Sequence, residues 1–166
     1  MSNQPFLDLL NNSGIALEIF LQKIPGDSAA KTPAAGGWTV LEQLEHIFIV
    51  EKGVRNALLA PGKENAQEKT ELYGDALLGK KMRGTGKWMA PDMVKPKGRF
   101  TDLPTVKKAI IEQRAFIRQK LENNEIVFDS TTFPHPIIGE MTRADWFYFM
   151  VHHTERHMRQ VEEMLG

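Results

Sequence analysis

Two histidines near the end of the chain, His153 and His157, have the spacing of residues that bind one metal ion together. Because they are four residues apart, on an α-helix one lies a turn above the other and both point the same way. The H-E-x-x-H zinc proteases bind their metal ion with two histidines at this spacing. The alternative is a pair of core histidines that hydrogen bond to neighbouring backbone atoms. His153 and His157 belong to one narrow stripe of residues at helical spacing. The stripe comprises Trp146, Met150, His153, His157, Val161 and Met164.

A third candidate ligand, His46, lies on a helix that the sequence predicts between Thr39 and Ala60. Thr39 and Glu42 have the spacing of a capping box, and Pro61 follows the end of the helix. His46 falls at the edge of the apolar stripe of this helix. An edge position fits either a surface histidine or a ligand that reaches sideways into a gap between helices.

Two polar residues are candidates to support a metal ion without being its main ligands. Glu51 projects from the centre of the apolar face of the predicted helix at 39–60, and a buried carboxylate needs a partner. Arg55, four residues on, is one candidate partner, and a metal-bound histidine is the other. Gln160 follows His157 by three residues on the same stripe, so it could hold that histidine or reach an open metal position through water.

The composition fits one soluble domain and narrows the ligand chemistry. The 166 residues include 21 basic and 21 acidic side chains, so the neutral chain offers no net field for nucleic acid or a membrane surface. Without cysteine, the chain has no disulfide, thiolate ligand or cysteine nucleophile, which leaves histidine and carboxylates as the strong metal ligands. No signal peptide and no run of about 18 apolar residues is found. We therefore expect a cytoplasmic protein with a single domain over residues 1–166.

Four amphipathic helices are predicted, at about 5–23, 39–60, 102–123 and 142–165, with a short helix at 71–81 and no strand signal. Four long helices in one domain predict an all-α four-helix bundle. The link at 61–101 is long enough to cross the bundle between the second and third helices, which gives an up-down-down-up order. With a rise of about 1.5 Å per residue, this order places His46 level with His153 and His157. Three neutral imidazoles suit Zn, Ni or Fe(II) and leave a position open for water or substrate.

Two further features are candidates for substrate recognition. Seven basic residues and one acidic residue, Asp92, lie between Gly79 and Phe100, which gives this segment a local charge of +6. The segment is either a solvated crossover loop or a rim that attracts an anionic substrate. His135 lies between two prolines, so it is held in an extended segment. It is either loop surface or a fixed recognition residue, and we do not expect it to bind the metal ion directly.

Three segments carry a resemblance to a known family. They are G-W-T-V-L-E-Q-L-E-H at 37–46, H-P-I-I-G-E-M-T-R-A-D-W at 135–146 and H-T-E-R-H-M-R-Q at 153–160. In their order and spacing the chain resembles the DinB-like (YfiT-type) family of metalloenzymes. The resemblance implies an up-down-down-up four-helix bundle, often a homodimer, with metal-binding histidines at His46, His153 and His157. Members of known activity include thiol-dependent S-transferases and a maleylpyruvate isomerase, which use low-molecular-weight bacterial thiols.

The predicted site and the resemblance together favour a divalent-metal-dependent enzyme, most concretely a thiol-dependent S-transferase whose nucleophile is an external thiol. An alternative from another class is a non-catalytic protein that uses the bundle and its metal ion as a structural or ligand-sensing module. A third is metal-dependent hydrolysis by bound hydroxide. The expected partners are a small-molecule substrate, a low-molecular-weight thiol and a second copy of the chain, and neither nucleic acid nor a membrane.

Overall fold

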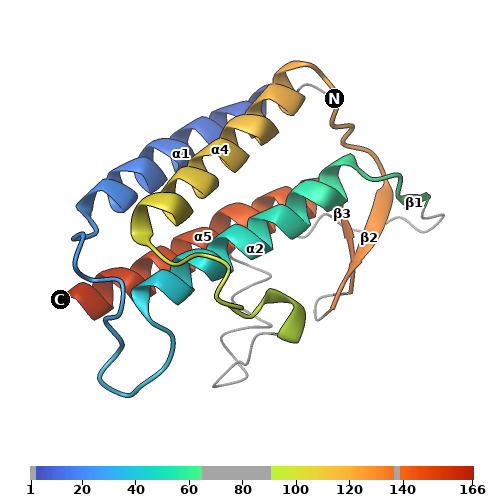
Figure 1. Cartoon of the computed structure of the whole chain (residues 1–166). Coiled ribbons are helices and arrows are strands. Elements are labelled where there is room, and N and C mark those ends of the chain that lie inside the picture. The colour runs from blue at the N-terminus through green and yellow to red at the C-terminus, as the bar shows by residue number, and fades with distance from the viewer. Residues whose placement is uncertain (1–2, 65–90, 137–138) are drawn as a thin grey trace.

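The computed structural model describes residues 3–64, 91–136 and 139–166. Figure 1 shows α1 and α4 side by side in one layer and α2 and α5 in the other, with α1 and α5 running opposite to α2 and α4. The predicted all-α, up-down-down-up bundle is therefore confirmed. None of the helices in the described ranges is long and apolar enough to span a membrane. The elements are α1 (Gln4–Lys23), α2 (Val40–Leu59), β1 (Lys63–Glu64), η1 (Asp92–Val94), α4 (Leu103–Glu122), β2 (Thr131–His135), β3 (Gly139–Thr142) and α5 (Arg143–Leu165).

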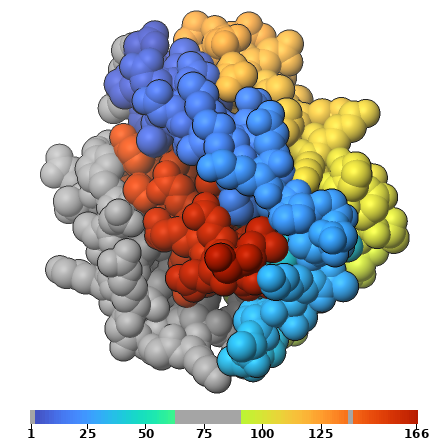
Figure 2. All heavy atoms as spheres, turned by 90° about the vertical axis from the view of Figure 1, so that its left-hand side faces the viewer, coloured from blue at the N-terminus to red at the C-terminus, as the bar shows by residue number. Residues whose placement is uncertain are grey.

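The two helices that carry the candidate ligands, α2 and α5, both begin at a capping box. The Thr39 hydroxyl accepts the Glu42 backbone N–H, and the Glu42 carboxylate accepts the Thr39 backbone N–H. Thr142 and Asp145 make the same reciprocal pair at the start of α5. Since these bonds satisfy backbone donors that have no partner within the helix, they fix where each helix begins and which side chains face inward. Figure 2 views the bundle from the C-terminal end of α5. In this view α5 lies between α1 and the segment that leads into α2.

Polar side chains divide the apolar core into two clusters along the bundle. One cluster surrounds Phe147 at the end near the strands, and the other surrounds Leu44 toward the opposite end. On α1, α4 and α5, a buried polar residue lies in sequence between the members of the two clusters, and on α2 a buried glutamate directly follows Val50, the first residue of that helix in the Phe147 cluster. These residues, which we call the polar layer, are Ser13, Glu51, Arg114 and Thr154.

An ion pair between Glu51 and Arg114 forms the centre of the polar layer. Arg114 donates from Nε and Nη2 to the two carboxylate oxygens of Glu51, at 2.7 and 2.9 Å. The Thr154 hydroxyl also donates to Glu51, and Arg114 Nη1 donates to the Ser13 hydroxyl, so the layer joins all four helices. Neither partner considered from the sequence is the observed one. Glu51 pairs with α4 rather than with a histidine or with Arg55, because Arg55 is half-buried over an aromatic ring of α4.

Short strands follow α2 and precede α5, and the expectation of no strand is wrong there. β2 pairs antiparallel with β3, with His135 opposite Gly139, and β1 pairs antiparallel with the start of β2. The prolines on either side of His135 obscured the strand, because proline cannot donate to a ladder. They are tolerated because β1 pairs only with Thr131 and Thr132, so the described residues leave that edge of β2 open further along.

The link between α2 and α4 is described only at its two ends. The predicted short helix at 71–81 and the basic residues before 91 lie outside the described residues. The described part that we call the crossover segment, residues 91–100, contains η1 and passes beside α2 before α4 begins (Figure 1). The predicted crossing of the bundle between the second and third long helices is therefore confirmed.

Candidate metal centre

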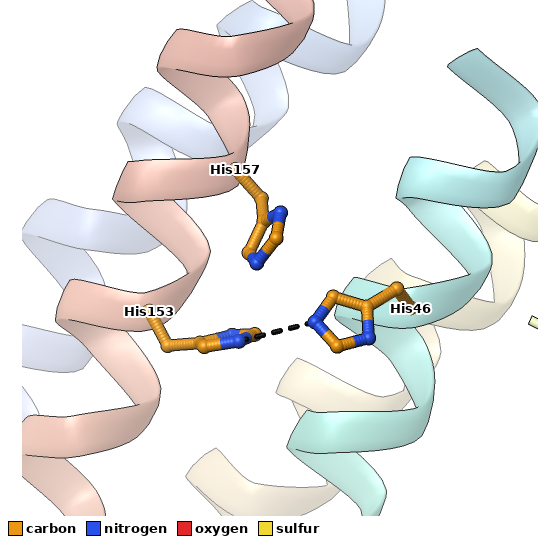
Figure 3. A group of neighbouring side chains, drawn as sticks. All are labelled: His46, His153 and His157. Atoms are coloured by element: carbon orange, nitrogen blue, oxygen red, sulfur yellow. Dashed lines mark hydrogen bonds between the residues drawn. The ribbon is translucent and has the colours of Figure 1, made fainter. Parts of the chain in front are cut away.

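The antiparallel packing of α2 and α5 brings the three predicted ligands together. His46 on α2 faces His153 and His157 on α5, and all three side chains are buried. Figure 3 shows the three rings turned toward one another between the two helices. One ring nitrogen of each residue lies within 4.8 Å of the other two, and His46 Nε2 lies 3.2 Å from His153 Nε2. This group could hold one metal ion.

Hydrogen bonds at the outer nitrogens orient two of the three rings. His46 Nδ1 lies 2.7 Å from the carbonyl oxygen of Val94 and donates its proton there. His157 Nδ1 lies 2.8 Å from the side-chain oxygen of Gln43 and donates to it. Each neutral ring then has its lone pair on Nε2, where it is available to a metal ion. A hydrogen bond from the outer nitrogen is the usual way in which a protein orients a metal-binding histidine.

The spacing of the ring nitrogens tests whether a metal ion fits. Two nitrogens that bind one tetrahedral zinc ion at about 2.0–2.1 Å lie about 3.3 Å apart, close to the 3.2 Å between His46 and His153. Two nitrogen lone pairs at this distance repel each other unless a proton or a metal ion lies between them. His153 Nδ1 has no hydrogen-bond partner among the described residues, so packing against Phe149 orients this ring. Both the spacing and the three imidazole donors fit a divalent ion.

Burial keeps all three imidazoles neutral. It is the largest cause of the lowered pKa of His46 and of a His153 pKa well below the usual 6.5. Burial also lowers the pKa of His157 to about 3, and the charge of Arg156 lowers the pKa of all three. A hydrogen bond between His157 and Gln160 acts in the opposite direction. Since imidazole binds a metal ion only when it is neutral, these ligands need lose no proton at neutral pH.

The family model of the DinB superfamily matches residues 14–161, which is most of the chain. This protein belongs to the DinB superfamily. Uncharacterized protein YuaE of Bacillus subtilis (strain 168) is 23% identical over 149 residues, which cover 87% of each chain. The crystal structure of TT2238, a four-helix bundle protein, matches with a TM-score of 0.58 at 19% identity and covers 98% of this chain and 99% of that one. This second likeness concerns the fold alone.

The other two histidines of this DinB protein do not join the three-histidine group. His152 is partly exposed, and its Nδ1 lies 3.8 Å from the carboxylate of Glu155. His135 is buried in β2, so it is not loop surface, and it packs against the rings of Trp146 and Phe149. Burial lowers the pKa of His135 to about 4, which keeps it neutral at pH 7.

Gln43 and Val94 are site residues that sequence reasoning missed. Gln43 precedes His46 by three residues, so both lie on the same face of α2, and that spacing is a signal that could have found it. Val94 contributes only its backbone carbonyl, and no residue type predicts such a contact.

The two predicted supporting residues of the DinB site have different surroundings. Gln160 lines the same cavity as His157, and its side chain raises the pKa of that histidine. Glu51 accepts a hydrogen bond from Thr154 of α5, the residue that follows His153. Any effect of Glu51 on His153 through this bond therefore passes through the backbone of α5. Whether either residue changes the affinity for a metal ion stays a prediction.

Two neighbouring residues of α2 hold the crossover segment against the site. The buried carboxylate of Glu45 accepts the backbone N–H groups of Lys97 and Phe100. His46 donates to the backbone carbonyl of Val94. All three bonds reach main-chain atoms, so they position the segment without depending on its side chains.

The three histidines line a cavity of about 950 Å³. Its described wall comes from the segment before α2, from α2 itself, and from the crossover segment, β2 and α5, and it includes His135, Arg156 and Gln160. A cavity of several hundred Å³ with a few converging polar groups is typical of a site for a small molecule. The DinB bundle therefore combines three histidines that could bind a metal ion with space for a small molecule beside them.

Proposed function

We propose that this protein binds one divalent metal ion, Zn, Ni or Fe(II), through His46, His153 and His157, and that it is a thiol-dependent S-transferase. The main support is that three buried, neutral imidazoles converge at the wall of a large cavity. Three protein ligands with an open position are typical of catalytic rather than structural metal sites. The resemblance to DinB-like enzymes that use thiols supports the reaction class.

In S-transfer, a thiol loses its proton and forms a C–S bond to an electrophilic carbon, from which a leaving group departs. A bound divalent ion would supply Lewis acidity, which favours the deprotonated form of a neighbouring thiol. The chain itself holds the three imidazoles neutral and keeps two of them oriented through Gln43 and the Val94 carbonyl. Since the chain has no cysteine, the sulfur nucleophile of this proposal comes from a low-molecular-weight thiol.

Metal content and thiol binding test the two parts of the proposal separately. We expect about one divalent ion per chain in the purified protein, measured by elemental analysis. In the Co(II)-substituted protein, a panel of small thiols should change the visible and near-ultraviolet spectrum, and matched alcohols should not. Without stoichiometric metal the metal site is refuted. With metal but no spectral response to any thiol, the transferase is refuted and a hydrolase or a non-catalytic module is supported.

A further inference from the structure

The charged residues that line the described cavity wall are both cationic. They are Lys95 and Arg156, and no carboxylate is among the described lining residues. Lys95 is paired with the exposed Asp92 at 2.9 Å. Arg156 has no ion pair or hydrogen bond with any other residue that the structure describes. Of the two cations, Arg156 is therefore the one that is available to a ligand.

Arg156 also lines the same cavity as the three histidines of the candidate metal centre. It is half-buried on α5, between His153 and His157 in the sequence. Its charge opposes the protonation of all three candidate ligands, His46 included. A guanidinium at the edge of a partly desolvated cavity binds a carboxylate through two parallel hydrogen bonds. An anionic group paired with Arg156 thus lies in the same cavity as the three imidazoles.

Apart from these two cations, the described cavity wall is largely apolar. The rings of Phe133, Trp146 and Phe149 lie there, together with the neutral imidazole of His135. Apolar walls attract apolar groups because burial removes their surface from water. A ligand that matches the whole cavity therefore has one acidic group and an apolar body.

We propose that the cavity binds a small organic carboxylate with an aliphatic or aromatic body, whose carboxylate pairs with Arg156 while its body lies against the apolar wall. One guanidinium neutralises the single charge of a carboxylate, whereas a group of higher charge would leave unpaired charge in a largely apolar cavity. The inference rests on the proposed function in one respect, that this cavity is the substrate site. The binding itself does not require the metal ion.

Calorimetric titration with phenylacetate and the neutral phenylacetamide tests the pairing. We expect the acid to bind the purified protein at least tenfold more tightly than the amide. Arg156→Met should weaken acid binding by roughly 10- to 100-fold, as expected for a lost hydrogen bond to a charged group, and leave amide binding unchanged. In a series of straight-chain acids, affinity should rise about fourfold for each added methylene that is buried. Equal binding of acid and amide, or affinity independent of chain length, would overturn the inference.

Arg159→Met is the matched control, because Arg159 is an exposed arginine on the same helix and does not line the cavity. It removes the same net charge and should leave acid binding unchanged. If both variants lose affinity equally, the effect is long-range charge and the proposed pair is refuted. The titration is repeated after removal of metal with a chelator. If the acid binds more tightly than the amide only when metal is present, and this preference persists in Arg156→Met, the carboxylate binds the metal ion. In that case the proposed pairing with Arg156 is refuted. Metal content is measured independently, so loss of the metal proposal leaves this test intact.

Discussion

Removing Arg114 from the polar layer should destabilise the bundle strongly, because it leaves the Glu51 carboxylate buried without its cation. The Glu51 side chain is 0% exposed and that of Arg114 is 5% exposed. Two bonds of 2.7 and 2.9 Å join them, and Thr154 alone would still donate to the carboxylate in Arg114→Met. Breaking a buried ion pair by removing one partner costs about 3–5 kcal/mol. That is a large part of the roughly 5–15 kcal/mol by which a domain is stable.

Urea unfolding followed by far-ultraviolet circular dichroism measures this cost. The double variant Glu51→Leu with Arg114→Met replaces both charges by apolar groups, so it should lose much less stability than the two single variants together. Lys108→Met is the matched control on the same helix. Lys108 lies 3.8 Å from Glu112 with both side chains exposed, and a surface pair of this kind contributes less than about 1 kcal/mol.

Two results would refute this reasoning. If Arg114→Met costs no more than Lys108→Met, the buried pair is not what stabilises the centre of the bundle. If the cost of the double variant equals the sum of the single variants, Glu51 and Arg114 are not energetically coupled.

Three other predictions follow from the site. His153→Ala and His157→Ala should each abolish stoichiometric metal in elemental analysis and His152→Ala should retain it; equal loss in all three would refute the assignment. Gln43→Leu should lower metal affinity by about 10- to 100-fold in a competition titration with a chelator, because His157 loses its orienting partner, and unchanged affinity would contradict this. Between pH 6.5 and 4 the unfolded chain protonates His135 and the folded chain does not, so the free energy of unfolding should rise with pH there, by up to about 3 kcal/mol. Urea unfolding across this range should show a smaller slope for His135→Asn, and an equal slope would contradict the burial effect.

The long helices and the three-histidine group could be predicted because their signals are local. Thr39 and Thr142 begin their helices with capping boxes that are visible in the sequence. The four-residue spacing of His153 and His157 places them on one face whatever surrounds the helix. His46 required one further step, since its position opposite that pair depends on the order of the helices.

Contacts between distant parts of the chain could not be predicted in this way. Arg114 pairs with Glu51 across 63 positions, and many other arginines would satisfy the same carboxylate equally well by charge alone. The Val94 contact is made by a backbone carbonyl, which every residue has. The β2 strand was missed because its prolines suggest a loop, and only the short length of β1 explains why they fit.

The way in which the crossover segment is attached has a consequence for how the cavity of this protein can change by mutation. Glu45 and His46 hydrogen bond to main-chain atoms of the crossover segment. Most substitutions in that segment should therefore leave these bonds in place. Met93 and Lys95, whose side chains help to line the cavity, can be exchanged without loosening the segment or disturbing the imidazole of His46. Mutation can therefore alter the shape and charge of the cavity independently of the three histidines. The same three histidines can in this way lie beside cavities of different shape and charge.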